Sequence, residues 1–208
     1  SLPPLPELPD PLRGQSLVDV TGAYLGDPSA GEELMRPLRE LGGAVWDTWD
    51  VLPAAELRHL GMDPEQPVPG IGDHTMVAEL TPDAADALVR VAGVGSGSPL
   101  IGVQVRQLGG ALGREPEGAG ALGKLDGEHL VFGVGTVLDE SMRAAVADHL
   151  GLIQSELAPY STGARVLNFS DRPGDVSAAF SADAWRRLTQ AKAEYDPGNL
   201  FRASHPVP

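Results

Sequence analysis

The sequence contains no cysteine, which excludes disulfide bonds, thiolate nucleophiles and zinc sites with sulfur ligands. Aromatic residues make up only 5% of the chain, and no apolar run approaches the ~20 residues of a membrane-spanning helix. Lys and Arg number 15 against 29 Asp and Glu, so the net charge of −14 argues against nucleic acid or an anionic membrane as a partner. The N-terminus also lacks the basic start and apolar stretch of a signal peptide, and we therefore expect a cytoplasmic protein.

What is present suits a globular protein. The 208 residues are 42% hydrophobic, which is enough to form a core in one domain or two small ones. The 26 glycines and 19 prolines indicate many turns. Prolines are concentrated at the N-terminus, so residues 1–15 are predicted to be an extended linker or surface strap.

Periodicity predicts the remaining elements. Alternating apolar and polar residues predict strands, and apolar residues repeated every three to four positions predict helices. Thr81 and Asp139 are residue types that typically cap the start of a helix. The predicted strands are 17–25, 44–51, 101–106, 129–136 and 165–169. The predicted helices are 29–41, a helix that begins at Thr81, a helix from Asp139 to Leu157, and a terminal helix with an apolar stripe from Trp185 to Tyr195. Residues 61–73 are predicted to be a loop because they are rich in proline and glycine.

This order of elements predicts an α+β fold with an antiparallel β-sheet, helices packed on one face, and a C-terminal helical segment. The opposite face would then display Asp19, Thr21, Gln104 and Arg106. Polar residues on one face are most simply solvated. The alternative is that this face covers a ligand, since glutamine and arginine together suit a polar substrate or a flavin edge.

The C-terminus carries the most specific motif, Lys192-Ala-Glu-Tyr195-Asp-Pro-Gly-Asn-Leu-Phe201-Arg202. Proline, glycine and asparagine after Asp196 end the helix, and Leu200 and Phe201 are then free to dock on another surface. This motif resembles the C-terminal signature of the berberine-bridge-enzyme-like branch of bacterial FAD-linked oxidases of the vanillyl-alcohol-oxidase type.

Two further segments are similar to the same family. In one, the strand with Gln104 and Arg106 runs into Gly109-Gly110, where glycine indicates close backbone approach or positive φ. The other is 166–171, which resembles a Tyr-x-Asn-Tyr/Phe segment and keeps Asn168. Valine and phenylalanine stand at the two tyrosine positions, 166 and 169.

The resemblance implies that this chain is the C-terminal portion of an FAD-dependent oxidoreductase whose substrate is a small hydroxylated or carbohydrate-like molecule. Asn168 would contact the cofactor, and Gln104 and Arg106 would face the substrate. Residues 16–157 would form the substrate (cap) domain, and 158–208 would pack on an N-terminal flavin-binding domain that is not in this chain. We therefore expect the chain alone to be inactive and to bind FAD weakly or not at all.

Alternatives remain at two points. Flavin oxidation of an alcohol needs a base for the hydroxyl proton, and with both tyrosines lost the candidates are Tyr160 and Tyr24, unless the substrate needs none. The chain could instead be a non-enzymatic α+β interaction module. The five histidines are too widely scattered to predict a metal site. The sequence also lacks the G-x-S-x-G nucleophile elbow that would indicate a hydrolase.

Overall fold

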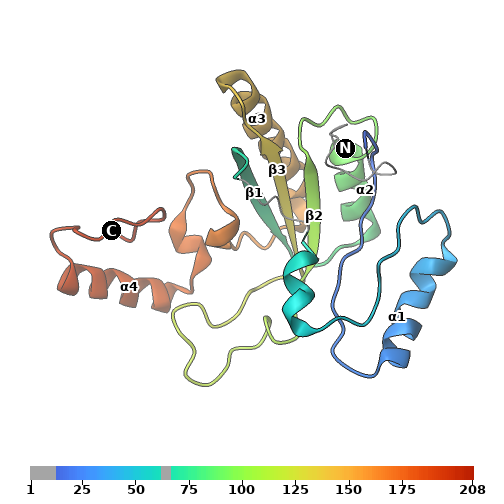
Figure 1. Ribbon diagram of the computed structural model, residues 1–208. Helices are drawn as coiled ribbons and strands as arrows, with labels where there is room; N and C mark the ends of the chain where they lie inside the picture. Colours follow the sequence, from blue (N-terminus) through green and yellow to red (C-terminus); the bar gives the residue numbers. More distant parts are fainter. Residues whose placement is uncertain (1–12, 62–66) are drawn as a thin grey trace. The chain divides into compact units, whose positions relative to one another are not determined.

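The computed structural model describes residues 13–61 and 67–208 (Figure 1). Contacts divide the chain into two compact units, Ser1–Val68 and Pro69–Pro208, here called the N-terminal and C-terminal units. Residues 1–12 of the predicted strap and 62–66 of the predicted loop lie outside the described residues. The boundary predicted between residues 157 and 158 stays a prediction.

The N-terminal unit contains one α-helix, α1 (Pro28–Glu40), and a 3-10 helix, η2 (Ala54–His59), among its described residues. The prediction of helix 29–41 is confirmed. Its start is set by Asp27, whose carboxylate accepts a hydrogen bond from the Ser29 N–H, with proline at the first position.

The strands predicted at 17–25 and 44–51 are wrong, because neither segment forms a strand. A strand is stable only when a neighbouring strand takes up its backbone groups and its apolar side chains are buried. Here Val18 is 94% exposed, and the rings of Tyr24 and Trp49 lie against Gly31 of α1 instead. Asp19 and Thr21 bond to each other and belong to no sheet.

The C-terminal unit is built on a three-stranded antiparallel sheet of β1 (Gly70–Val77), β2 (Gly102–Gln107) and β3 (His129–Thr136), in the order β1-β3-β2. The strands predicted at 101–106 and 129–136 are confirmed. The loop predicted to run to residue 73 is wrong from Gly70 onward. A Cβ on Gly72 would meet the Phe132 ring at 2.4 Å, so this glycine permits close packing inside a strand and does not mark a turn.

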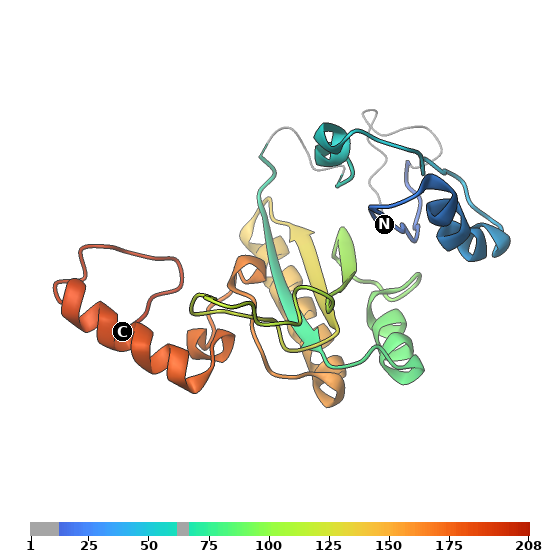
Figure 2. The same cartoon turned by 90° about the horizontal axis from the view of Figure 1, so that it is seen from below.

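Two helices, α2 (Pro82–Ala92) and α3 (Glu140–Leu157), cover one face of this sheet (Figures 1 and 2). Both predicted caps are confirmed, since Thr81 and Asp139 each accept a bond from the first turn. Leu150 packs where a Cβ on Gly133 would stand, so the glycines of β3 bring α3 close to the sheet. The core on this face consists of Ile71, Val77, Ala87, Val91, Leu100, Val131, Val137, Val146, Leu150, Ile153 and Leu157.

The C-terminal part contains three 3-10 turns, η3 (Ala158–Tyr160), η4 (Leu167–Phe169) and η5 (Val176–Ala179), and then α4 (Ala182–Tyr195). The terminal helix is confirmed, and Asn199 after it has a φ of 49°. The strand predicted at 165–169 is wrong: the backbone there bonds to a side chain of β1, and η4 forms. No residue of α4 is buried, and both views show it standing apart from the sheet (Figures 1 and 2).

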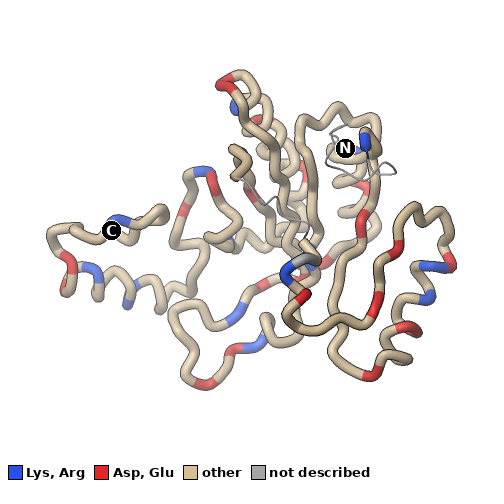
Figure 3. Tube along the Cα trace, in the orientation of Figure 1, with Lys and Arg blue, Asp and Glu red and all other residues tan. Residues whose placement is uncertain are grey.

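The predicted α+β class is confirmed, with helices on one face of an antiparallel sheet and a helical C-terminal segment. Across residues 13–61 and 67–208, no helix is long and apolar enough to cross a membrane. Charged residues of both signs are spread along the described chain (Figure 3).

Candidate cofactor and substrate site

The sheet face opposite α2 and α3, here called the outer face, carries Gln104 and Arg106. In the β2–β3 register Gln104 pairs with Phe132 and Arg106 pairs with Leu130, so all four side chains share one face. Gly133, the next residue of β3, faces Leu150 of α3 on the other side. The expectation that Gln104 and Arg106 lie opposite the helices therefore agrees with the structure, and both side chains are exposed.

Arg106 is held in one orientation by two neighbours. Its Nε and Nη2 donate to Gln104 Oε1 at 3.0 and 2.6 Å. Its guanidinium carbon lies 4.8 Å from the centroid of the Phe169 ring, a cation–π arrangement. The Phe169 ring in turn packs edge-on against Phe132, with centroids 5.2 Å apart. The guanidinium is thus fixed over an aromatic stack on the outer face.

Asn168 lies in η4, directly before Phe169. It is exposed, and its side-chain amide makes no hydrogen bond to the parts of the chain that the structure describes. Its neighbour Phe169 contacts Arg106, so the structure brings η4, the turn that contains Asn168, to the outer face beside β2. The free amide can both donate and accept.

Tyr160, the candidate base, is placed elsewhere. It lies in η3 after α3 and packs against the hydrophobic core on the helix-covered face. The structure therefore does not bring Tyr160 together with Gln104, Arg106 and Asn168. The other candidate, Tyr24, belongs to the N-terminal unit.

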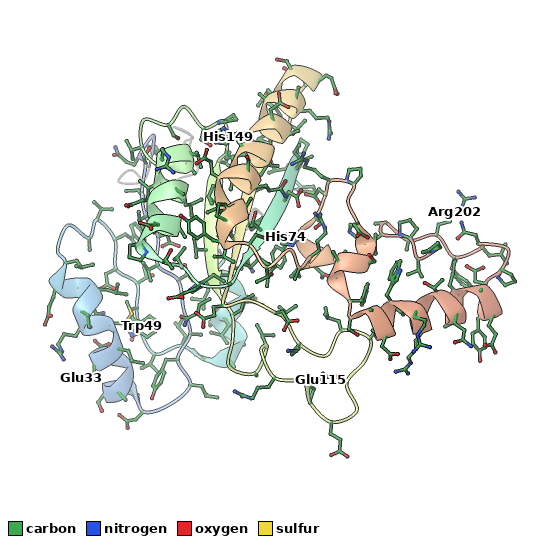
Figure 4. All side chains as sticks on the ribbon, turned by 180° about the vertical axis from the view of Figure 1, so that it is seen from behind. Glu33, Trp49, His74, Glu115, His149 and Arg202 are labelled. Atoms are coloured by element: carbon green, nitrogen blue, oxygen red, sulfur yellow. The ribbon has the colours of Figure 1, made fainter. Side chains whose placement is uncertain are left out.

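Sequence reasoning missed a buried polar cluster beneath η4, formed by Asp73, His74, Arg165 and Ser170 (Figure 4 labels His74). Of its two members on β1, Asp73 falls inside the segment predicted to be a loop, residues 61–73, and His74 follows that segment with no predicted element. The signal is present, since residues 71–77 alternate between Ile, Asp, Thr and Val on one side and Gly, His and Met on the other. Nearby prolines and glycines outweigh that alternation.

Asp73 is the charged centre of this cluster. Arg165 Nη2 lies 3.3 Å and Arg172 Nη1 3.7 Å from its carboxylate oxygens, and the His74 N–H donates to it at 2.9 Å. Burial by itself would raise the pKa of Asp73, but the contacts with His74 and the charge of Arg165 outweigh burial and lower it. Asp73 is therefore a carboxylate that stays ionised inside the fold.

Ser170, His74 and Asp73 lie close together but do not form a hydrolytic triad. Ser170 Oγ at 3.2 Å and Asp73 Oδ1 at 3.6 Å both approach the same imidazole nitrogen, Nδ1. The second nitrogen, Nε2, already accepts the Val166 N–H. A triad needs one nitrogen facing the serine and the other facing the carboxylate, so the cluster is structural.

Gly109 and Gly110, near the start of the loop after β2, have φ angles of +83° and +51°. This confirms the predicted positive φ, and a Cβ at either position would meet nothing within 4 Å. A hollow of about 660 Å³ lies between residues 115–126 of this loop and α4. Its lining includes Lys124 and Arg187, together with Met76 of β1 and Val166 before η4, but none of Gln104, Arg106 and Asn168.

The C-terminal signature forms a hydrogen-bonded turn after α4, here called the tail turn. Asp196 accepts hydrogen bonds from the backbone N–H groups of Leu200 and Phe201, at 2.7 and 3.2 Å, and also pairs with Lys192. Lys192 reaches Asn199 Oδ1 at 2.9 Å and the Phe201 carbonyl at 3.2 Å. The Lys192 contact, together with these backbone N–H groups, lowers the pKa of Asp196. The tail turn leaves Leu200 85% and Phe201 79% exposed.

Comparison with known proteins gives one family match. The family model described as "Berberine and berberine like" matches residues 167–208, the stretch that contains Asn168 and the terminal signature. Curated proteins gave no match.

Several solved structures share the fold. A single-substitution variant of BBE-like 1 from Physcomitrella patens is 17% identical, covers 89% of this chain and 43% of its own, and has a TM-score of 0.69. A variant of berberine bridge enzyme is 16% identical, covers 89% and 44%, and has a TM-score of 0.63. Aclacinomycin oxidoreductase is 21% identical, covers 66% and 32%, and has a TM-score of 0.53.

The chain spans less than half the length of these structures. At such identities the likeness shows the fold, and the family match covers the terminal segment. Taken together with the outer-face geometry, these findings show that the chain resembles the C-terminal part of berberine-bridge-enzyme-like proteins.

Proposed function

We propose that this chain is the C-terminal portion of an FAD-linked oxidoreductase and that its outer face covers the flavin. The observation that supports the proposal is the contact between Arg106 and Phe169, which holds η4, the turn that contains Asn168, against β2. The family match over residues 167–208 supports the same assignment.

The residues present fit such a cofactor. The Asn168 amide has no partner among the described residues and offers both a donor and an acceptor to the polar edge of a flavin ring. Gly109 and Gly110 present backbone without a side chain in front of it. When bound, the flavin would supply the hydride acceptor, and this chain would supply orientation and a roof.

Gln104 and Arg106 are the proposed substrate contacts. Gln104 holds the guanidinium while Arg106 keeps further N–H groups directed at solvent, so the pair suits an oxygen-rich molecule. A small hydroxylated or carbohydrate-like substrate meets that description. Phl p 4, a structural neighbour with 16% identity, is described as having glucose dehydrogenase activity.

The remaining parts would come from an N-terminal flavin-binding domain. Leu200 and Phe201, held outward by the tail turn, are the proposed docking residues. Val166 and Phe169 carry no ionisable group, and Tyr160 packs on the helix-covered face. If the substrate needs a base, the candidates are then Tyr24 of the N-terminal unit and a group of the flavin-binding domain.

The test measures FAD binding by flavin fluorescence, with the chain alone and assembled with the flavin-binding domain encoded beside it. We expect weak or no binding alone and stoichiometric flavin absorbance in the assembly. In the assembly, Asn168→Ala should weaken FAD binding roughly tenfold, the cost of one hydrogen bond. Stoichiometric flavin on the isolated chain, or an assembly without flavin, would contradict the proposal.

Substrate contact is tested separately with a matched pair on β2. Gln104→Ala should raise KM for a hydroxylated substrate several-fold, because Arg106 loses its partner. Gln107→Ala, an exposed glutamine on the other face of the same strand, should leave KM unchanged. Equal effects of the two changes would remove Gln104 from the site.

A non-enzymatic interaction module is the second candidate, favoured by the exposure of Leu200 and Phe201. It predicts that the neighbouring domain in the gene binds no flavin and yet associates through this tail. Flavin analysis of the assembly therefore separates the two functions.

A further inference from the structure

His74 connects β1 to the turn that carries Asn168. Its side chain projects from the middle of β1, is buried, and reaches three residues of segment 166–170. Figure 4 shows it where the sheet meets the C-terminal part. No other side chain of β1 bonds to the backbone of this segment among the described residues. The imidazole therefore ties η4 to β1, next to the two hydrogen bonds that join Gly72 of the same strand to Asp171.

Both ring nitrogens are committed to backbone partners. Nδ1 lies 3.0 Å from the Phe169 carbonyl oxygen, and Nε2 lies 2.9 Å from the Val166 nitrogen. A carbonyl can only accept and an amide N–H can only donate, so Nδ1 must carry the proton and Nε2 must be bare. One bond is made just before η4, at Val166, and the other at its last residue, Phe169, so Asn168 lies between the two bonded positions.

The surroundings hold this arrangement. Arg165 Nη2 donates to Ser170 Oγ at 2.8 Å, and that oxygen lies 3.2 Å from His74 Nδ1. From the helix side, Gln154 Nε2 donates to the His74 carbonyl at 3.1 Å, which anchors the backbone. A second proton on the ring would remove the acceptor for the Val166 N–H. The charged group closest to the ring is the Asp73 carboxylate, with Oδ1 3.6 Å from Nδ1, and Arg165 Nη2 lies 3.3 Å from that same oxygen.

We propose that His74, as the neutral Nδ1–H tautomer, is the positioning residue that latches the Asn168 turn onto the outer face. Because the Phe169 ring contacts the Arg106 guanidinium, the same latch also helps to position Arg106 on the outer face. The inference deepens the proposed function, because it rests on Asn168 as the cofactor contact. Its first two tests, however, need no cofactor.

The first test reads the tautomer directly. Long-range ¹H–¹⁵N spectra of the full chain labelled at histidine should show an Nδ1–H imidazole at neutral pH, and His74→Asn should remove that signal. An Nε2–H tautomer or an imidazolium at His74 would overturn the proposal. This measurement uses the unaltered chain and does not depend on how any variant folds.

The second test separates the two bonds. His74→Gln can place an amide oxygen near the Nε2 position and keep the bond from Val166, whereas His74→Asn reaches only the Nδ1 position. Hydrogen exchange of the Val166 amide should be at least about tenfold faster in His74→Asn than in His74→Gln. Unchanged exchange in His74→Asn would overturn the latch.

The third test asks whether the latch acts through Asn168. In the assembly with the flavin-binding domain, His74→Asn should weaken FAD binding, and adding it to Asn168→Ala should cause little further loss. Fully additive losses would overturn the positioning role. If Asn168→Ala leaves FAD binding unchanged, the proposed function is at fault, and the tautomer and exchange results still decide the latch.

Discussion

At the scale of single residues, Asp73 shows how one buried carboxylate organises its surroundings. It balances Arg165 and Arg172, which come from a segment more than ninety residues later in the chain. Asp73→Asn keeps the shape but leaves both cations without their counter-charge. Because the two arginines are partly exposed, we expect a loss of about 1–3 kcal/mol in the free energy of unfolding by urea.

The same residue predicts a pH dependence. The folded-state pKa of Asp73 lies below its ordinary value, so its contribution is complete above about pH 4 and is lost as the pH falls through the folded pKa. The difference in unfolding free energy between the natural chain and Asp73→Asn should be constant from neutral pH down to about pH 4. Below about pH 4 this difference should become smaller. Asp148→Asn, at an exposed position on α3, is the control and should show no such gap.

At the residue scale, the sequence predicts a site only where a motif exists. Asn168, Gln104 and Arg106 are named through the resemblance, and their roles stay a prediction, while the contact between Arg106 and Phe169 brings η4 to β2. His74 is not found, because its role depends on β1 lying beside a segment about ninety residues away. Neither residue type nor local spacing contains that contact.

At the scale of elements, the start of α2 is set by one side chain. Thr81 Oγ1 accepts the Ala84 N–H at 3.2 Å. Thr81→Ala should cost about 1 kcal/mol in urea unfolding, whereas Thr81→Ser keeps the hydroxyl and should stay close to the natural chain. Equal losses in both variants would mean that the threonine methyl, not the cap, matters.

The packing of α3 gives a larger effect. Leu150 is 2% exposed and fills the space above Gly133, whereas Leu152 on the same helix is 43% exposed. Leu150→Ala should lower the unfolding free energy by about 2–5 kcal/mol, because it removes buried methyl groups and leaves a cavity. Leu152→Ala should change it by less than about 0.5 kcal/mol in the same assay.

Elements with local signals are predicted well from the sequence, and elements that depend on distant pairing are not. The caps of α2 and α3 and the alternation of β2 and β3 can all be identified within a short window of sequence. The segments 17–25 and 44–51 alternate in the same way but have no strand partner, so the pattern alone is insufficient. β1 is the reverse case, a strand that forms although the sequence predicts a loop over its first residues. Its glycines indicate a turn when read alone, but in the structure Gly72 makes room for the Phe132 ring of the partner strand.

At the scale of the whole molecule, the tail is the part built for another surface. Replacing Leu200 and Phe201 together by Asp should not change the stability of the chain, because both side chains are already exposed. The same change should abolish assembly with the flavin-binding domain, measured by size-exclusion chromatography. Val94→Asp, at an equally exposed position after α2, should assemble normally. Assembly of the tail variant would exclude the tail as the docking element.

The strand order has a practical consequence for anyone handling this protein. Because β2 ends the sheet, no described strand pairs with its outer edge, and a row of unsatisfied backbone groups faces outward there. Such an edge can recruit a strand from a second copy and lead to self-association. We therefore expect concentrated samples of the chain alone to aggregate, and a charged or proline substitution on β2 to keep them monodisperse.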